Sequence, residues 1–340
     1  MNNVWKIEER LFNQQVTARD KIKFLLKYAV LAPSTHNSQP WLFKIKDNSV
    51  EIYIDESRKL PQADPLGRDL YISIGCMLEN LIIAARYFGF YERHVYHLKD
   101  DFVAEVFFKS AHNAQQNLLF NAITTRVNAR GVFDNKPVDK AILDYVADLV
   151  KPETEFEGGI RFDFISEKNK ITRLAELTAR GLKMAHSSHV FRQEMSRWLI
   201  SNFSKRKTGL PGYSLKMPGI VSIFFPALVG FFNFGFLLSK LNYASFTSSP
   251  GVCVLSSQND EPEAWLDTGR LAERLMLGFN AREIKTSVFV AALEMGDLYK
   301  SAQETLNIGL NWRPQFLFCA GYMSGGQKHT PRESVEERLI

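Results

Sequence analysis

The sequence has few cysteines and lacks the usual short motifs of cofactor and metal chemistry. Its three cysteines, Cys76, Cys253 and Cys319, stand far apart with neither disulfide nor zinc spacing, so we expect a reducing, cytoplasmic setting. No Rossmann, Walker or Gly-x-Ser-x-Gly pattern occurs. His186 and His189 would share a helical face, but no third ligand follows them, so we expect no metal.

A strong excess of one charge is also missing. The chain has 42 Lys and Arg against 37 Asp and Glu, a net charge of +5 spread without a long basic run. This balance excludes nucleic acid as an expected partner, whereas a slight positive excess suits a small anion such as a phosphate ester. Residues 1–9 lack the apolar core of a signal peptide.

One long hydrophobic run is present, since residues 217–239 contain no charged residue. By length alone this run could cross a bilayer. Pro226 and Gly230 predict instead that it breaks into two short pieces. We expect a buried helical hairpin, a lid inserted at about 205–245, and regard a membrane as an unlikely partner. A transmembrane span and an interfacial or dimer surface are the alternatives.

The hydrophobic pattern predicts an α+β chain, and a length of 340 residues suggests two lobes. Apolar spacing predicts the first lobe's helices and strands from residue 20 to residue 108. In order these are a helix from Asp20 to Ala32, strands at 41–45 and 50–54, a helix from Arg68 to Gly89, and strands at 92–98 and 103–108.

The second lobe appears as a repeat of the first one. Asp139 opens a helix as Asp20 does, and residues 161–165 form a strand in the place of 41–45. A helix at 267–279, a loop at 286–289 and a strand at 314–322 follow. We therefore predict two domains, 1–112 and 113–340, each an antiparallel-rich sheet with packed helices.

A polar loop lies between the first helix and the first strand. Pro33 stops the helix because proline disfavours helical geometry at the residue before it. Pro40 then precedes the strand. The side chains between these prolines form a dense set of donors and acceptors: Ser34, Thr35, His36, Asn37, Ser38 and Gln39.

The two lobes differ in a complementary way. Arg126, Asn128 and Arg130 alternate ahead of the second lobe's helix, and the first lobe has no such arrangement at 9–13. Conversely, the second lobe has three acidic residues at 153–157, where the first lobe has its polar loop. Acidic groups repel phosphate, so we expect one composite site between the lobes.

These motifs and their order resemble the nitroreductase superfamily, flavoenzymes that hold FMN, and most of all its Acg-type branch. The chain would be a fused nitroreductase dimer, two pseudo-repeated lobes with a single flavin site. By this resemblance, Arg126 and Asn128 would meet the FMN phosphate and Arg130 the edge of the ring. The other residues implied to bind FMN are Pro33, Ser34, Thr35, Asn37, Gln39, Ser287 in the loop at 286–289, and Arg332 near the C-terminus.

The resemblance also implies an activity. NAD(P)H would reduce FMN and leave, and an electron-poor small molecule would then take the electrons, without a catalytic side chain of the protein. A monomeric pseudo-dimer is favoured and a homodimer is possible. The alternatives are a protein that sequesters FMN with little turnover, and a membrane-associated binding protein that uses residues 217–239.

Overall fold

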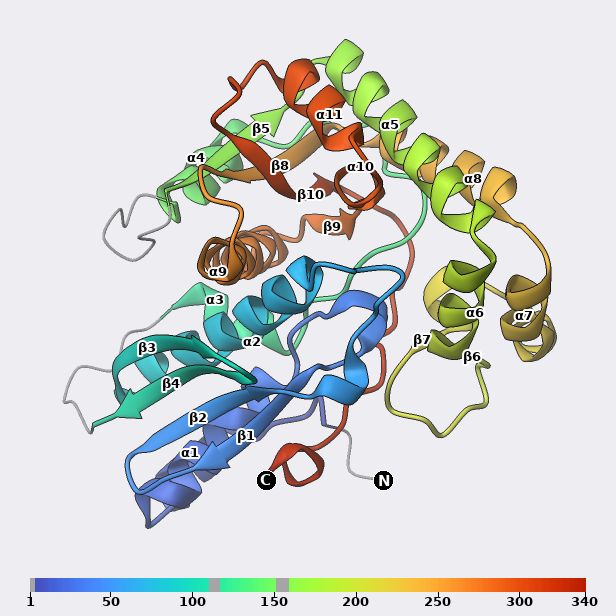
Figure 1. Cartoon of the computed structure of the whole chain (residues 1–340). Helices are drawn as coiled ribbons and strands as arrows, with labels where there is room; N and C mark the ends of the chain where they lie inside the picture. Colours follow the sequence, from blue (N-terminus) through green and yellow to red (C-terminus); the bar gives the residue numbers. More distant parts are fainter. Residues whose placement is uncertain (1–3, 110–116, 151–158) are drawn as a thin grey trace.

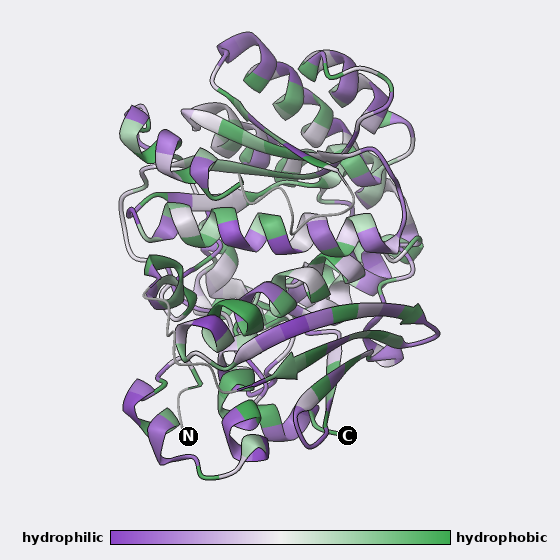
Figure 2. Ribbon diagram, turned by 90° about the vertical axis from the view of Figure 1, so that its left-hand side faces the viewer, coloured by the Kyte–Doolittle hydropathy of each residue, from purple (hydrophilic) through white to green (hydrophobic). Residues whose placement is uncertain are grey.

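The computed structural model describes residues 4–109, 117–150 and 159–340. Two four-stranded sheets lie on opposite sides of a pair of long helices (Figure 1). Figure 2 shows the same layers from the side, with the C-terminal end of the chain near the lower sheet. Sheets and helices occur together and all pairings in the two large sheets are antiparallel, which confirms the predicted α+β class.

The first sheet contains every strand predicted for the first lobe. Its order is β1-β2-β4-β3. Its strands are β1 (Trp41–Ile45), β2 (Ser49–Ile54), β3 (Tyr91–Lys99) and β4 (Phe102–Phe108).

The second sheet has the same topology. Its order is β5-β8-β10-β9, so in both sheets the strands, counted along the chain, lie in the order 1-2-4-3. A long helix joins the second strand to the third in each case, α2 (Arg68–Tyr87) in one and α9 (Pro262–Asn280) in the other. The strands are β5 (Ile160–Ile165), β8 (Gly251–Ser257), β9 (Lys285–Val288) and β10 (Arg313–Gly321). The domain boundary at 112/113 lies outside the described residues and stays a prediction.

The two long helices cross closely because glycine stands at the contact on both sides. A Cβ on Gly75 would lie 2.1 Å from the Leu266 carbonyl oxygen, and one on Gly269 would lie 2.1 Å from that of Ile72. Helix α9 begins at Pro262, five residues before the predicted start, since proline fits the first turn, whose N–H groups need no helical partner.

Shorter helices pack around the sheets and the long helices. These are α1 (Ala18–Ala29), α3 (Leu118–Ile123), α4 (Lys140–Asp148), α10 (Ala291–Glu294) and α11 (Leu298–Leu306), with 3-10 turns η1 (Glu9–Gln14), η3 (Glu56–Arg58) and η5 (Val335–Arg338). Helix α1 begins two residues before the predicted start at Asp20. Thr17 caps α1, and its hydroxyl accepts from the Asp20 backbone N–H at 3.1 Å.

A large insertion separates β5 from β8. It comprises α5 (Lys168–Ser187), α6 (His189–Trp198), the short strands β6 (Leu199–Ile200) and β7 (Leu210–Pro211), η4 (Gly212–Leu215), α7 (Gly219–Phe231) and α8 (Gly235–Ser248). The insertion is therefore much longer than the predicted 205–245.

Helices α7 and α8 form the expected hairpin, but two details of the prediction are wrong. Pro226 lies inside α7, and the chain turns at Asn233, whose side chain accepts from the Gly235 N–H at 2.8 Å. The hairpin is also not buried, because many of its large apolar side chains are exposed. Together α7 and α8 are long and apolar enough to cross a membrane but are bent by 118°, whereas α2, which passes the same test alone, is a buried core helix.

Candidate functional site

Two adjoining cavities lie between the lobes, one of about 80 Å³ and one of about 320 Å³. Pro33, Ser34, Arg126, Asn128 and Arg130 line both of them, so the cavities form one site. The polar loop and the arginine segment, far apart in the sequence, thus meet as expected for a composite site. The larger cavity is within the size range of small-molecule sites.

The polar loop has an unusual backbone. It forms the 3-10 turn η2 (Thr35–Asn37), with φ of 53° at His36, 56° at Asn37 and 54° at Gln39. Positive φ is uncommon for residues other than glycine, and such backbone persists only where surrounding contacts fix it. Here the Asn37 amide donates to the carbonyls of Gly209 at 3.1 Å and Pro331 at 3.0 Å. The insertion and the C-terminal segment therefore hold the loop in shape.

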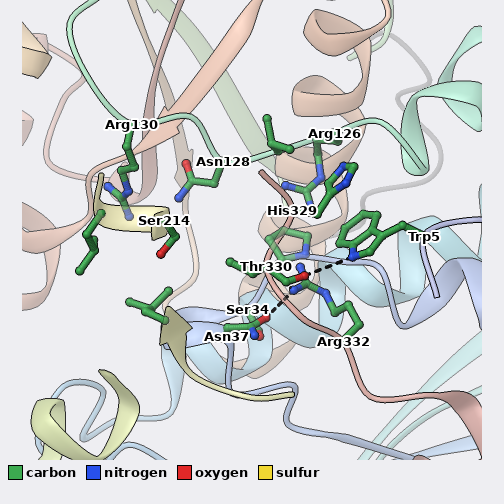
Figure 3. A pocket seen from close by; sticks show the side chains of 14 residues that line it. Trp5, Ser34, Asn37, Arg126, Asn128, Arg130, Ser214, His329, Thr330 and Arg332 are labelled. Carbon is green, nitrogen blue, oxygen red and sulfur yellow. Dashed lines mark hydrogen bonds between the residues drawn. The ribbon is translucent and has the colours of Figure 1, made fainter. Parts of the chain in front are cut away.

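The smaller cavity carries excess positive charge (Figure 3). Arg126 donates from Nε to Glu273 at 3.0 Å and from Nη2 to the Leu31 carbonyl at 3.3 Å. Arg332, 5% exposed, donates to the Asn37 side chain, and its Nε is buried without a hydrogen bond to any described residue. Burial, then the charge of Arg126, lowers the pKa of Arg332 to about 9. Two guanidinium groups share one carboxylate, which suits an added anion.

A third cation, Arg130, lines both cavities. Arg130 donates from Nη1 to the Val288 carbonyl at 3.5 Å and makes no ion pair within the described ranges. Burial lowers its pKa. Asn128 forms an isolated bridge with Thr286, and its Oδ1 accepts from the Val288 N–H at 3.1 Å. The strand β9 therefore fixes the arginine segment against the second sheet.

The wall of the smaller cavity includes residues that the sequence reasoning missed. Trp5 stacks on His329 with 3.9 Å between ring centroids, and its Nε1 donates to the Thr330 carbonyl at 3.1 Å (Figure 3). His329 and Thr330 directly precede the predicted segment around Arg332, which was a usable signal. Nothing in the sequence around Trp5 indicated a site.

The larger cavity is mainly apolar, with one acidic corner. Asp69 and Glu294 both line it. Burial, then the charge of Glu294, raises the pKa of Asp69 well above its usual range. Glu294 pairs with the buried Arg68, and the Thr35 hydroxyl donates to Asp69 at 3.3 Å. Apolar walls come from Ile72, Met276, Phe289, Phe316 and, on the hairpin, Phe225, Val229 and Leu238.

Most of the predicted site residues line these cavities. Thr35 lines only the larger cavity. Pro33, Ser34, Asn37, Arg126, Asn128, Arg130 and Arg332 line the smaller one.

Two predicted site residues lie behind the cavity wall. Gln39 is fully buried, and its side chain donates to the Lys207 carbonyl at 2.8 Å and accepts from the Glu333 N–H at 2.9 Å. Ser287 lies within β9, opposite Cys319, where a loop was predicted. Its neighbours in sequence, Val288 and Phe289, line the larger cavity instead. Neither side chain lines the cavities, because the left-handed loop buries Gln39 and the strand buries Ser287.

Two further features singled out in the sequence are the histidine pair and the acidic segment at 153–157. Among the described residues, no group of three His, Cys, Asp or Glu side chains could hold a metal ion. His186 lines the larger cavity, and burial lowers its pKa to about 4. The acidic residues at 153–157 lie outside the described residues.

Comparison with known proteins supports the resemblance. No family model matches the chain. A Mycobacterium tuberculosis protein with the provisional name NAD(P)H nitroreductase is 34% identical over 70 residues, 21% of this chain and 20% of that protein. The Acg protein of the same organism, provisionally named in the same way, is 37% identical over 65 residues, 19% of this chain and 20% of that protein. The chain is similar to Acg-type nitroreductases. Each matched segment spans only about a fifth of the relative's length.

Solved nitroreductase structures are similar to a larger part of the chain. The FMN-dependent nitroreductase NfnB of Mycobacterium smegmatis, solved with NADPH, has a TM-score of 0.41 and 19% identity over 65% of this chain and 96% of its own. A nitroreductase of Desulfitobacterium hafniense with bound FMN has a TM-score of 0.41 and 12% identity over 66% of this chain and 98% of its own.

Proposed function

We propose that the chain binds FMN and is a nitroreductase-like oxidoreductase that passes electrons from NAD(P)H to an electron-poor small molecule. One observation carries this proposal: a small cationic cavity adjoins a larger apolar one between the lobes. A ligand with a phosphate at one end and a flat aromatic ring at the other matches this pair. The provisional names of the sequence relatives agree with the activity.

The residues present fit FMN. Arg126 and Arg332 would hold the phosphate, since guanidinium groups bind phosphate oxygens with two parallel hydrogen bonds. The buried Nε of Arg332 supplies a donor that no described residue uses. Ser34 and Asn128 add polar groups where the cavities adjoin, and the apolar walls of the larger cavity suit an aromatic ring.

The chain's own residues would bind and orient FMN and exclude water from it. When bound, FMN supplies the chemistry of hydride acceptance and donation. Arg130 would place a positive charge beside the ring, and no described residue forms an ion pair with it. Asp69, whose pKa is raised by burial and by the charge of Glu294, lies in the wall of the larger cavity. Side chains of the α7–α8 hairpin close one side of that cavity.

A protein that sequesters FMN is the second candidate function, and the hairpin favours it. Phe225, Val229 and Leu238 cover the larger cavity and would limit the approach of a nicotinamide. Steady-state kinetics of NADPH oxidation by the FMN-loaded protein separates the candidates. Parallel double-reciprocal lines with a nitroaromatic or quinone acceptor support the oxidoreductase, whereas bound FMN that NADPH does not reduce supports sequestration.

The phosphate assignment is tested by Arg332→Ala, which removes one of the two cations and leaves the ion pair of Arg126 with Glu273 in place. Loss of a hydrogen bond to a charged group costs about 1.5–3 kcal/mol, so FMN affinity should fall about ten- to a hundredfold. Riboflavin lacks the phosphate, so its affinity should change little. Fluorescence titration of both flavins measures the two effects. Arg126→Ala should act in the same direction.

Arg338→Ala is the matched control. Arg338 is equally buried in the same C-terminal segment but lines neither cavity and pairs with Asp55 and Glu333. It should leave the ratio of FMN to riboflavin affinity unchanged. Equal losses of the two flavins in Arg332→Ala would contradict the assignment.

A further inference from the structure

The hairpin carries an exposed apolar surface on the side facing away from the cavities. We call this surface the hairpin patch and define it as Ile220, Phe224, Phe231, Phe232, Phe236 and Leu237. Each of these side chains is more than half exposed, Ile220 and Phe231 at 74%. In Figure 1, α7 lies at the right-hand edge of the molecule, away from both sheets.

Both faces of α7 are apolar, but only one face is used within the molecule. Ser222 and Val229 are buried, and Phe225 and Val229 line the larger cavity. Ile220, Phe224 and Phe231 fall at helical spacing on the other face. A contiguous set of large exposed apolar side chains commonly marks an interaction site, whereas isolated ones need no explanation.

The chain segment that carries the hairpin patch has charges of one sign only. Residues 195–259 contain no Asp or Glu. The Lys240 and Lys183 ammonium groups lie 4.5 and 5.5 Å from the centre of the Phe236 ring. The basic residues of this stretch are Arg197, Lys205, Arg206, Lys207, Lys216 and Lys240. A surface that is both positive and apolar is complementary to a partner whose outer layer is negatively charged and whose interior is apolar.

We propose that the hairpin patch docks on the surface of an anionic lipid bilayer. Exposed aromatic and aliphatic side chains would enter the boundary of headgroups and acyl chains, and lysines would contact the acidic headgroups. The bend of 118° between α7 and α8 suits helices that lie on the surface and not a span. A second copy of the chain is the poorer occupant, because a twofold contact here would bring lysines together without acidic partners from 195–259.

The test is sedimentation of the full-length protein with lipid vesicles. Vesicles of phosphatidylglycerol and phosphatidylcholine in equal parts should bind it, and pure phosphatidylcholine vesicles should bind it at least about tenfold more weakly. Binding to the mixed vesicles should weaken as salt is added, since salt screens the charges. Equal binding to both kinds of vesicle, or to neither, overturns the proposal.

Two variants locate the contact on the hairpin patch. The double variant Ile220→Asp, Phe224→Asp changes only exposed positions. It should weaken vesicle binding at least about tenfold, because the free energy gained when these apolar side chains pass from water into the bilayer is lost. The double variant Lys183→Glu, Lys240→Glu should weaken binding to the anionic vesicles by a similar factor and leave binding to pure phosphatidylcholine vesicles unchanged. FMN binding, measured in parallel, should not change in either variant.

Leu310→Asp is the matched control, because Leu310 is 92% exposed outside the hairpin patch. It should bind vesicles like the unaltered protein. Equal losses in the control and in the hairpin variants contradict docking through the patch. The proposal is also overturned if the protein does not bind vesicles but forms dimers that the Ile220→Asp and Phe224→Asp changes dissociate. A second copy of the chain would then be the occupant of the patch.

Discussion

His36 combines backbone strain, burial and positive surroundings in one residue. Its φ is 53°, and its Nε2 is buried without a hydrogen bond to any described residue. Burial, then the charges of Arg130 and His186, lowers its pKa to about 4. The ring is therefore neutral near pH 7, and it lies in the wall of the larger cavity.

Replacing His36 by Asn should change how stability depends on pH. An unfolded histidine takes up a proton near pH 6.5, but the folded one does so near 4, so His36 makes stability rise with pH between these values. The contribution is up to about 1.4 kcal/mol per pH unit. Asn cannot titrate and tolerates positive φ. The slope of unfolding free energy against pH, from urea titrations between pH 4 and 6.5, should therefore be smaller in His36→Asn.

The prediction concerns the difference between the variant and the unaltered protein. Asp64 titrates in the same range with the opposite sign, because burial raises its pKa to about 6. Both proteins contain Asp64, so its effect cancels in the comparison. Identical slopes would contradict the lowered pKa of His36.

At this scale the sequence predicted which residue types gather, but not which way each one faces. The two prolines and the polar residues between them indicated a binding loop, and Ser34 and Asn37 line the cavity. Gln39 looked equally suitable and lies behind it. The difference depends on the left-handed backbone at His36, Asn37 and Gln39. Hydrogen bonds to Gly209 and Pro331, which lie far along the chain, support this backbone. Local sequence does not contain those contacts.

At the scale of elements, the crossing of α2 and α9 depends on two glycines. We expect Gly269→Ala to lower the free energy of unfolding by at least about 1–3 kcal/mol, because the new methyl group would overlap the Ile72 backbone. Gly326→Ala is the control, since nothing lies within 4 Å of its Cβ position. Urea unfolding of both variants measures the difference. Equal stability of the two would show that the helices can move apart at little cost.

A buried charge network lies beside this crossing. The Glu79 carboxylate accepts from Arg274 at 2.7 Å and from Arg270 at 3.3 Å, and all three side chains are buried. Glu79→Ala should lower the free energy of unfolding by about 3–5 kcal/mol, the usual cost of removing one partner of a buried ion pair. Chemical denaturation measures this loss. A loss below about 1 kcal/mol, typical of exposed pairs, would contradict it.

Strands and helices with a clear period were predicted well, and those decided by distant contacts were not. The strand at 41–45 was found as predicted because its pattern is local. The segment 286–289 was predicted as a loop, although residues 285–288 form β9 by pairing with β10. Pro226 was expected to end a helix, but α7 continues past Pro226 to Phe231 and packs along α6. Proline has no N–H, so this continuation costs one backbone hydrogen bond of the helix.

At the scale of the whole molecule, the two four-stranded sheets have the same topology, and among the described residues one cluster of arginines lines the two cavities. The order 1-2-4-3 recurs in both sheets, and the long helix occupies the same place in both lobes. Only one lobe supplies Arg126 and Arg130, and the other supplies the loop from Pro33 to Asn37. This asymmetry is what the predicted fused pair of subunits with a single site requires.

A fused pair with one site should bind one FMN per chain as a monomer. The ratio follows from the absorbance of released flavin at known protein concentration, and the mass from sedimentation equilibrium. Saturating FMN should also raise the thermal midpoint by several degrees. Ligand at about a hundred times its Kd adds roughly 2.7 kcal/mol of stability, whereas riboflavin at the same concentration should add less because it cannot use Arg126 and Arg332. Two FMN per chain would show that both sites survive. One FMN per two chains would show that the site is shared between copies.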